Sequence, residues 1–143
     1  MINVYRISSD QSEMDIESIH EFISQSYWAK DIPMETLRKA IDNSLCFGVF
    51  NSQGSQVGFA RMITDLATYA YLADVYVLKE HRGKGLSKSL MQEIMSHPDM
   101  QGLRRMTLAT LDAHGLYEKF GFSELVTPEV FMENWNPEVY SNA

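Results

Sequence analysis

Two glycines stand close together in the segment Glu80-His81-Arg82-Gly83-Lys84-Gly85-Leu86-Ser87, between an apolar run and an amphipathic one. A turn of this kind, from a strand into a helix, can direct several backbone N–H groups at one anion, and the helix dipole adds to the attraction. Arg82, Lys84 and Lys88 place positive charge beside it. The segment therefore predicts a pyrophosphate-binding turn. A plain glycine-rich turn with solvated cations is the competing interpretation.

Two common nucleotide-binding motifs do not fit this turn. A P-loop needs glycine, four residues and then Gly-Lys-Ser/Thr, but Lys88-Ser89 follows Ser87 and not a glycine. The dinucleotide fingerprint needs a third glycine three residues after Gly85, where this chain has Lys88. The turn therefore favours a different phosphate-bearing ligand.

Metal chemistry and covalent acyl-enzyme chemistry are disfavoured. No Gly-x-Ser-x-Gly elbow is present, and the single cysteine, Cys46, lies in the apolar run 45–50, which is typical of a small buried side chain. The histidines show no metal-ligand spacing with one another or with Cys46. They are His20, His81, His97 and His114.

The elements that must position the turn follow from hydrophobic periodicity and from turn residues. Period-two patterns predict strands over 2–7, 45–50, 56–64, 68–77, 106–111 and 130–132, and helical spacing predicts helices over 16–28, 33–41, 86–96 and 113–120. The residues 51–55 read as the loop of an antiparallel hairpin. This order predicts an α+β fold with a mixed, mostly antiparallel central sheet and helices on both faces. Where two strands change from antiparallel to parallel, they can separate and expose backbone donors to a ligand.

Composition favours one domain over residues 1–143. The chain is 45% apolar, which suits a single core of this length. It contains no apolar run of about eighteen residues, and its first residues lack the features of a signal peptide, so we expect a cytoplasmic protein. A net charge of −7 disfavours nucleic acid and anionic membranes as partners and favours cationic amines as substrates.

Two separated segments resemble the GNAT superfamily of N-acetyltransferases. The family signature is Arg or Gln, two residues, Gly, one residue, then Gly or Ala, and Arg82, Gly85 and Ser87 occupy these positions, with serine as a departure at the last. The second segment is Leu116-Tyr117-Glu118-Lys119-Phe120-Gly121-Phe122, which follows in the order typical of the family. The resemblance is to a small single-domain bacterial-type member, and it implies the acyl-CoA N-acyltransferase fold.

The resemblance also implies acetyl-CoA as co-substrate and no metal. The backbone of the turn would bind the pyrophosphate, and the pantetheine arm and thioester would lie along the strand 68–77, beside the strand 106–111. An N–H at or near Val77 would polarise the thioester carbonyl. His114 could contact coenzyme A or relay a proton, although a hydrogen bond at a helix start is the competing role. The residues expected to bind the cofactor are Val75, Tyr76, Val77, Arg82, Gly83, Lys84, Gly85, Leu86, Ser87, Lys88, Asp112 and His114.

Tyr117 matches the family tyrosine that protonates the departing coenzyme A thiolate; a core tyrosine is the competing role. The acceptor amine must lose a proton, and Asp74 is the candidate base. Glu80 and Asp112 are further candidates. A structural role for Asp74, with solvent taking the proton, is the alternative.

Family resemblance implies that aromatic side chains line the acceptor site, where they could hold an ammonium or a peptide; the same residues could simply be core. We expect an N-acetyltransferase that acts by direct attack in a ternary complex on a small-molecule, peptide or protein amine. A non-catalytic acyl-CoA-binding sensor is the alternative. A homodimer is also expected, with the residues 130–132 in its interface. The acceptor-site candidates are Tyr27, Trp28 and Tyr71, with Tyr69 and Trp135 also within reach.

Overall fold

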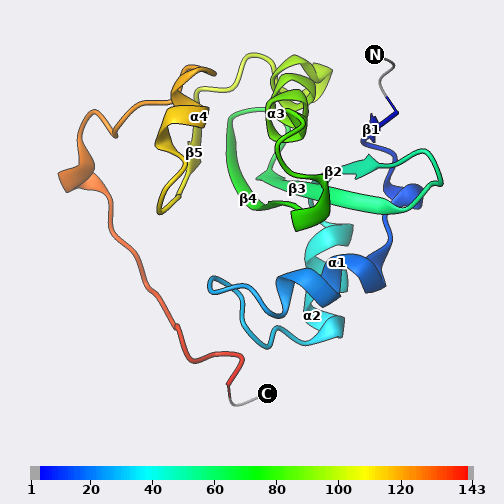
Figure 1. Cartoon of the computed structure of the whole chain (residues 1–143). Coiled ribbons are helices and arrows are strands. Elements are labelled where there is room, and N and C mark those ends of the chain that lie inside the picture. The colour runs from blue at the N-terminus through cyan, green and yellow to red at the C-terminus, as the bar shows by residue number, and fades with distance from the viewer. Residues whose placement is uncertain (1–3, 142–143) are drawn as a thin grey trace.

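The computed structural model describes residues 4–141 and confirms the expected fold class. Part of the first predicted strand, residues 2–3, lies outside the described residues. Four short 3-10 turns, η1 (Gln11–Glu13), η2 (Lys79–His81), η3 (Pro98–Met100) and η4 (Pro128–Val130), join the main elements. Those elements are β1 (Arg6–Ser8), α1 (Ile16–Ile23), α2 (Met34–Asp42), β2 (Leu45–Phe50), β3 (Gln56–Thr64), β4 (Tyr69–Val77), α3 (Leu86–Ser96), β5 (Arg105–Leu108) and α4 (His114–Glu118) (Figure 1).

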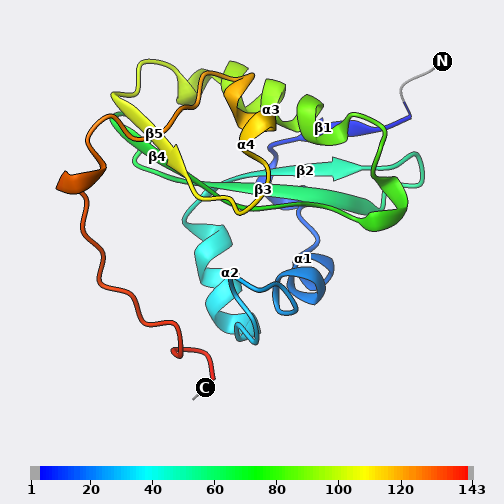
Figure 2. The same cartoon turned by 60° about the vertical axis from the view of Figure 1, so that its left-hand side comes forward.

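The five strands form one sheet in the order β1-β2-β3-β4-β5. Neighbouring strands are antiparallel except β4 and β5, which run parallel. Figure 2 shows α1 and α2 on one face of this sheet, with α3 and α4 on the other. Each face has its own apolar core, so the sheet is covered on both sides as predicted.

The helices bury their apolar stripes against the two faces. Asp15 caps α1 by accepting a hydrogen bond from the Ser18 N–H at 3.2 Å, and Ile19 and Ile23 of the same helix are fully buried. On the other face α3 buries four side chains in the core that it shares with the sheet. They are Leu86, Leu90, Met91 and Ile94. The helical spacing of these residues is the pattern from which the sequence predicted a helix over 86–96.

A β-bulge interrupts β4 at Asp74. Phe59 of β3 is opposite Tyr76, whereas Arg61 is opposite Ala73, so β4 carries an extra residue between these pairs. Asp74 has a φ of +57°, which is a strained conformation for a residue with a side chain. The bulge shifts the alternation of the strand by one residue. Tyr76 therefore packs in the α1–α2 core instead of the α3 core.

β4 and β5 separate after a short common stretch. Their pairing runs from Tyr69 with Arg105 to Leu72 with Leu108, and β4 then continues to Val77 without a β5 partner. The strand expected over 106–111 thus ends at residue 108, because the residues after it leave the ladder.

The expected strand over 130–132 is wrong. Residue 130 ends the η4 turn, and the residues after it are extended but pair with no strand in 4–141. No helix within the described residues is long and apolar enough to cross a membrane.

Candidate functional site

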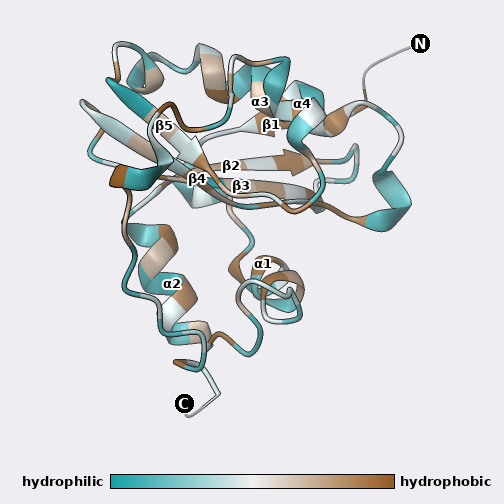
Figure 3. Cartoon of the chain, turned by 90° about the vertical axis from the view of Figure 1, so that its left-hand side faces the viewer, coloured by the Kyte–Doolittle hydropathy of each residue, from teal (hydrophilic) through white to brown (hydrophobic). Residues whose placement is uncertain are grey.

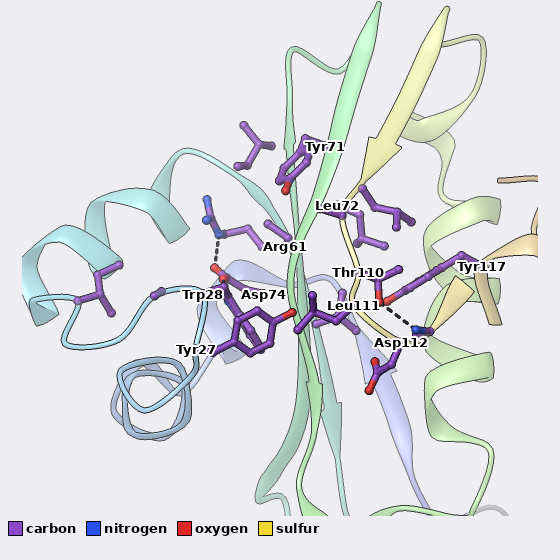
Figure 4. A pocket seen from close by; sticks show the side chains of 18 of the residues that line it. Tyr27, Trp28, Arg61, Tyr71, Leu72, Asp74, Thr110, Leu111, Asp112 and Tyr117 are labelled. Atoms are coloured by element: carbon purple, nitrogen blue, oxygen red, sulfur yellow. Dashed lines mark hydrogen bonds and ion pairs between the residues drawn. The ribbon is translucent and has the colours of Figure 1, made fainter. Parts of the chain in front are cut away.

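A cavity of about 760 Å³ opens where β4 and β5 separate. Its walls come from the loop after α1, from β3 and β4, from the chain that follows β5, and from the C-terminal segment. Figure 4 shows side chains entering it from two sides: Tyr27, Trp28, Arg61 and Asp74 from the α1–α2 side, and Thr110, Asp112 and Tyr117 from the α4 side. The parallel-strand gap predicted from the sequence is therefore the centre of the candidate site.

Asp74 is held on the first of these sides by two hydrogen bonds. Trp28 Nε1 donates to its Oδ1 at 2.7 Å, and Arg61 Nε donates to its Oδ2 at 2.9 Å. Arg61 also donates from Nη1 to the Ser44 hydroxyl at 3.1 Å. The Arg61 and Asp74 side chains are only 14% and 6% exposed, so the two charges neutralise each other away from water. The bulge turns the Asp74 side chain towards Trp28 and Arg61.

Aromatic rings border the same side of the cavity. The rings of Tyr27 and Trp28 meet edge to face with centroids 5.1 Å apart, and Tyr27 is 68% exposed. Tyr71 lies on β4 before the bulge, and burial, with neighbouring Tyr69 and Asp74, raises its pKa. Tyr71 thus stays a neutral hydrogen-bonding phenol at physiological pH. The C-terminal segment adds Trp135 and Tyr140 to the cavity wall.

Tyr117 forms the opposite wall. It is 8% exposed, and its ring packs edge to face with Phe122 at 6.1 Å between centroids. Burial raises the pKa of its phenol, so the hydroxyl remains protonated at neutral pH. Figure 4 shows Tyr117 directed from α4 towards the chain that follows β5, which carries Thr110. This wall offers a proton donor, whereas the Asp74 wall offers a locked ion pair.

The glycine turn lies beyond the end of β4. Gly83 and Gly85 have φ values of +79° and +77°, and nothing lies within 4 Å of where a Cβ would stand on either. Gly85 is the N-cap of α3, and no side chain caps this helix. Arg82 holds the turn to the strand by donating from Nε to the Val77 carbonyl at 2.8 Å. The first N–H groups of α3 are therefore without a side-chain cap, which leaves them available to an anion.

The cavity brings together many, but not all, of the residues predicted from sequence. Tyr76 is not among the cavity residues; its ring stacks on Phe22 with centroids 4.0 Å apart, so only its backbone could face a ligand. His114 lines a neighbouring groove, and the residues 82–88 lie at the turn. Tyr69 does not line the cavity, whereas the predicted residues that do are Tyr27, Trp28, Tyr71, Asp74, Val75, Asp112, Tyr117 and Trp135. Their roles stay predictions.

Arg61 was missed by sequence reasoning. It is the only charged residue in β3, in a stretch that is otherwise mostly apolar and buried. A lone charge inside such a strand usually needs a buried partner, and that signal could have identified it. In the described part of the chain, no group of three or more His, Cys, Asp or Glu side chains is arranged to hold a metal ion.

A family match, a sequence relative and a solved structure all give the same family. Residues 42–124 match the family described as an acetyltransferase (GNAT) domain. A candidate acetyltransferase of Gibberella zeae is 34% identical over 80% of this chain and 76% of its own length. A crystal structure of a candidate GNAT acetyltransferase from Xanthomonas campestris pv. campestris has a TM-score of 0.94, is 54% identical and covers 99% of both chains, so the C-terminal segment is included in the match.

A more distant structure shows the fold alone. Glucosamine-6-phosphate N-acetyltransferase from Arabidopsis thaliana has a TM-score of 0.61 at 19% identity, over 93% of this chain and 99% of that one. The family match over residues 42–124 and the relatives at 34% and 54% identity show that the chain belongs to the GNAT acetyltransferase family, and the divided sheet and the glycine turn agree with this.

Proposed function

We propose that this protein transfers an acetyl group from acetyl-CoA to an amine by direct attack in a ternary complex. The observation that carries the proposal is the separation of β4 and β5 beyond Leu72 and Leu108, which leaves one edge of β4 unpaired beside a cavity of about 760 Å³. An extended pantetheine arm could pair with that edge as an added strand would. The nearby turn supports a pyrophosphate, because both glycines leave their surroundings open.

The proposed binding roles follow the chain from β4 to α3. Backbone groups of Val75, Tyr76 and Val77 would receive the arm and the thioester carbonyl, and an N–H near Val77 would stabilise the developing oxyanion. The backbone from Arg82 through Ser87 would bind the pyrophosphate, with Lys84 and Lys88 adding charge. Asp112 and His114 would contact coenzyme A from the side of the cavity that follows β5.

In the proposed reaction the amine nitrogen attacks the thioester carbonyl carbon. A C–N bond forms, the C–S bond breaks, and the nitrogen gives up a proton. The Tyr117 hydroxyl supplies a proton to the departing sulfur and is then reprotonated from solvent. Burial raises the pKa of Tyr117, so the phenol still carries its proton when the thiolate forms.

Asp74 could serve either as the base or as a positioning residue. The second role has more support, since each of its carboxylate oxygens already accepts a hydrogen bond, one from Trp28 and one from Arg61. In that role Asp74 holds both side chains at the acceptor cavity, and solvent takes the amine proton. Replacing Asp74 by Asn separates the roles: loss of the acidic limb of the pH–rate profile supports the base, whereas an unchanged limb with a raised KM for the amine supports positioning.

The amine acceptor would enter beside Tyr27, Trp28 and Tyr71. These rings provide flat apolar surface and hydrogen-bonding hydroxyls, and the Arg61–Asp74 pair adds no net charge. An amine presented on a small molecule or at a peptide terminus could bind there as the neutral base that attack requires.

The decisive experiment measures free thiol released from acetyl-CoA in the presence of a panel of amines. Release that depends on the amine, with the acetylated product detected by mass spectrometry, is the expected result. Binding of acetyl-CoA without thiol release for any amine would favour the non-catalytic acyl-CoA sensor. No thermal shift with coenzyme A would overturn both functions.

A further inference from the structure

Arg61 is the only basic residue among those that line the cavity between β4 and β5, and much of its hydrogen-bonding capacity is unused. A guanidinium carries five N–H donors. Arg61 gives one to Asp74 and one to the Ser44 hydroxyl, and no other group within residues 4–141 accepts from it. Because Tyr76 Oη is the only buried side-chain nitrogen or oxygen without a partner among the described residues, the unpaired Arg61 Nη2 must reach accessible space. Its N–H groups are therefore available to a ligand.

The Tyr71 hydroxyl lies beside this guanidinium and is also unused. Arg61 pairs with Ala73 across the β3–β4 ladder, and Ile63 pairs with Tyr71, so Arg61 and Tyr71 are diagonal neighbours on one face of the sheet. Burial is the main cause of the raised pKa of Tyr71, and the charge of Arg61 is near enough to oppose it. Figure 4 shows the Tyr71 hydroxyl directed towards the Arg61 side of the cavity. No hydrogen bond to this hydroxyl comes from residues 4–141.

The two ends of the cavity differ in electrostatic character. At the α1–α2 end both oxygens of Asp74 already accept hydrogen bonds, so the polar groups that remain are the donors of Arg61 and Tyr71. At the other end Asp112, an exposed carboxylate, stands on the chain that follows β5 (Figure 4). A molecule with an anionic group at one end and an amine at the other matches this polarity. Its amine would then lie towards Tyr117.

The walls between these two ends are largely apolar and limit the size of the acceptor. The rings of Tyr27 and Trp28 border one side. The C-terminal segment closes the outer side with Trp135 and Tyr140; Figure 3 shows this segment passing beside α2, and Tyr140 packs against the α1–α2 core. A cavity of about 760 Å³ is the size of a small-molecule site. A small acceptor with an apolar side chain fits these walls.

We propose that the acceptor is a free amino acid with an apolar or aromatic side chain, and that Arg61, assisted by the Tyr71 hydroxyl, binds its carboxylate. This inference rests on the proposed acetyl transfer and narrows its acceptor. The unused N–H groups of Arg61 form charge-assisted hydrogen bonds to the carboxylate, while Asp74 fixes the orientation of the guanidinium. A zwitterion carries no net charge, so the net charge of −7 on the chain does not repel it.

Matched acceptors give the first test. Phenylalanine, phenylalanine amide and phenethylamine share a ring and an amine, and only the first carries a carboxylate. With kcat/KM expressed per neutral amine, phenylalanine should be better than either analogue by at least about 10-fold. Equal values would overturn this inference and leave acetyl transfer in place, whereas no thiol release with these or any other amine would remove the proposed function. An aspartyl peptide amide that exceeds phenylalanine would also overturn it, in favour of a peptide acceptor.

Two substitutions test the residues themselves. Arg61→Lys keeps a positive charge beside Asp74 but loses the free guanidinium donors, and Tyr71→Phe removes only the hydroxyl. Each should reduce the preference for phenylalanine over phenethylamine by about 10-fold. This preference is a ratio within one variant, so losses of folded protein or of general rate cancel. The matched control is Arg6→Lys, at an exposed arginine outside the cavity, which should keep the wild-type preference. A preference that survives both cavity substitutions contradicts the proposal.

Binding of the product tests the carboxylate site without turnover. Both tryptophans of the chain line the cavity, so their fluorescence reports its occupancy. N-acetylphenylalanine should bind more tightly than N-acetylphenylalanine amide by at least about 10-fold, and Arg61→Lys should remove most of that difference. Equal affinities of the wild type for the two compounds would rule out a carboxylate site at Arg61, whatever the result of the activity assay.

Discussion

The two walls of the cleft between β4 and β5 are built in different ways. The β4 wall pairs with β3 on both sides of the bulge, and its Asp74 carboxylate is fixed by Trp28 and Arg61. The opposite wall rests on a strand of four residues and a helix of five, and Tyr117 is held there by packing against Phe122. The comparison shows a wall fixed by a buried ion pair facing a wall held by aromatic packing, and on the proposed mechanism the first would position the acceptor while the second would supply the proton.

The largest effect should come from breaking the buried ion pair of the β4 wall. Replacing Arg61 by Met leaves the Asp74 carboxylate buried without its partner, and we expect a loss of about 3–5 kcal/mol in the free energy of unfolding by urea. The matched control is Arg6→Met, which breaks the ion pair with Glu13 at 2.6 Å, where the side chains are 57% and 32% exposed. That change should cost less than about 1 kcal/mol. Equal losses in the two variants would contradict the view that the β4 wall is locked by burial.

A substitution in the wall formed by β5 and α4 should change the catalytic rate and not the stability of the fold. Replacing Tyr117 by Phe should lower kcat by about 100-fold or more, because the sulfur then leaves without its proton donor. Acetyl-CoA affinity and the urea midpoint should change little. Burial raises the pKa of Tyr117, so the loss of wild-type activity caused by phenol ionisation should begin only above pH 10, the ordinary value for this group, and the Phe variant should lack it. Full activity in the variant would remove Tyr117 from the mechanism.

A substitution at Trp28 tests whether the hydrogen bonds of the β4 wall also position the acceptor amine. The substitution Trp28→Phe keeps an aromatic ring but removes the indole donor to Asp74, leaving one carboxylate oxygen without that bond. We expect a loss of about 1–2 kcal/mol in stability and a several-fold higher KM for the amine. The kcat and the KM for acetyl-CoA should stay close to wild type. A selective fall in kcat would instead place Trp28 with the reacting groups.

The smallest effect should come from a substitution in the glycine turn between β4 and α3. An alanine at Gly85 must adopt a φ of +77°, which costs about 1 kcal/mol and disturbs the first N–H groups of α3. Gly54, in the β2–β3 hairpin, has a similar φ of +84° and equally open surroundings, so Gly54→Ala is a control with the same strain. Both variants should lose similar stability, and only Gly85→Ala should raise the KM for acetyl-CoA. A raised KM in both would attribute the effect to strain alone.

Much of the fold could be predicted from local patterns. The apolar spacing of Ile19 and Ile23 located α1, and the two glycines near Arg82 located the turn before α3, because periodicity and positive φ are local properties. The strand expected at 130–132 failed because a strand exists only with a partner, and the described part of the chain provides none. Arg61 and Asp74 are thirteen residues apart, and only the register of two strands and a bulge joins them.

The extra residue at Asp74 divides β4 into two parts, and the alternation of side chains between the two faces of the sheet is shifted by one residue from one part to the other. Before it, Tyr71 lines the cavity between β4 and β5 while Leu72 packs on the α3 side; after it, Tyr76 packs on the α1–α2 side while Val77 turns to α3. Anyone who engineers this strand must therefore count positions separately on each side of residue 74. Deleting that residue would exchange inward and outward positions along half of the strand. Conversely, new acceptor preferences can be sought before the bulge without altering the half that is proposed to receive the thioester.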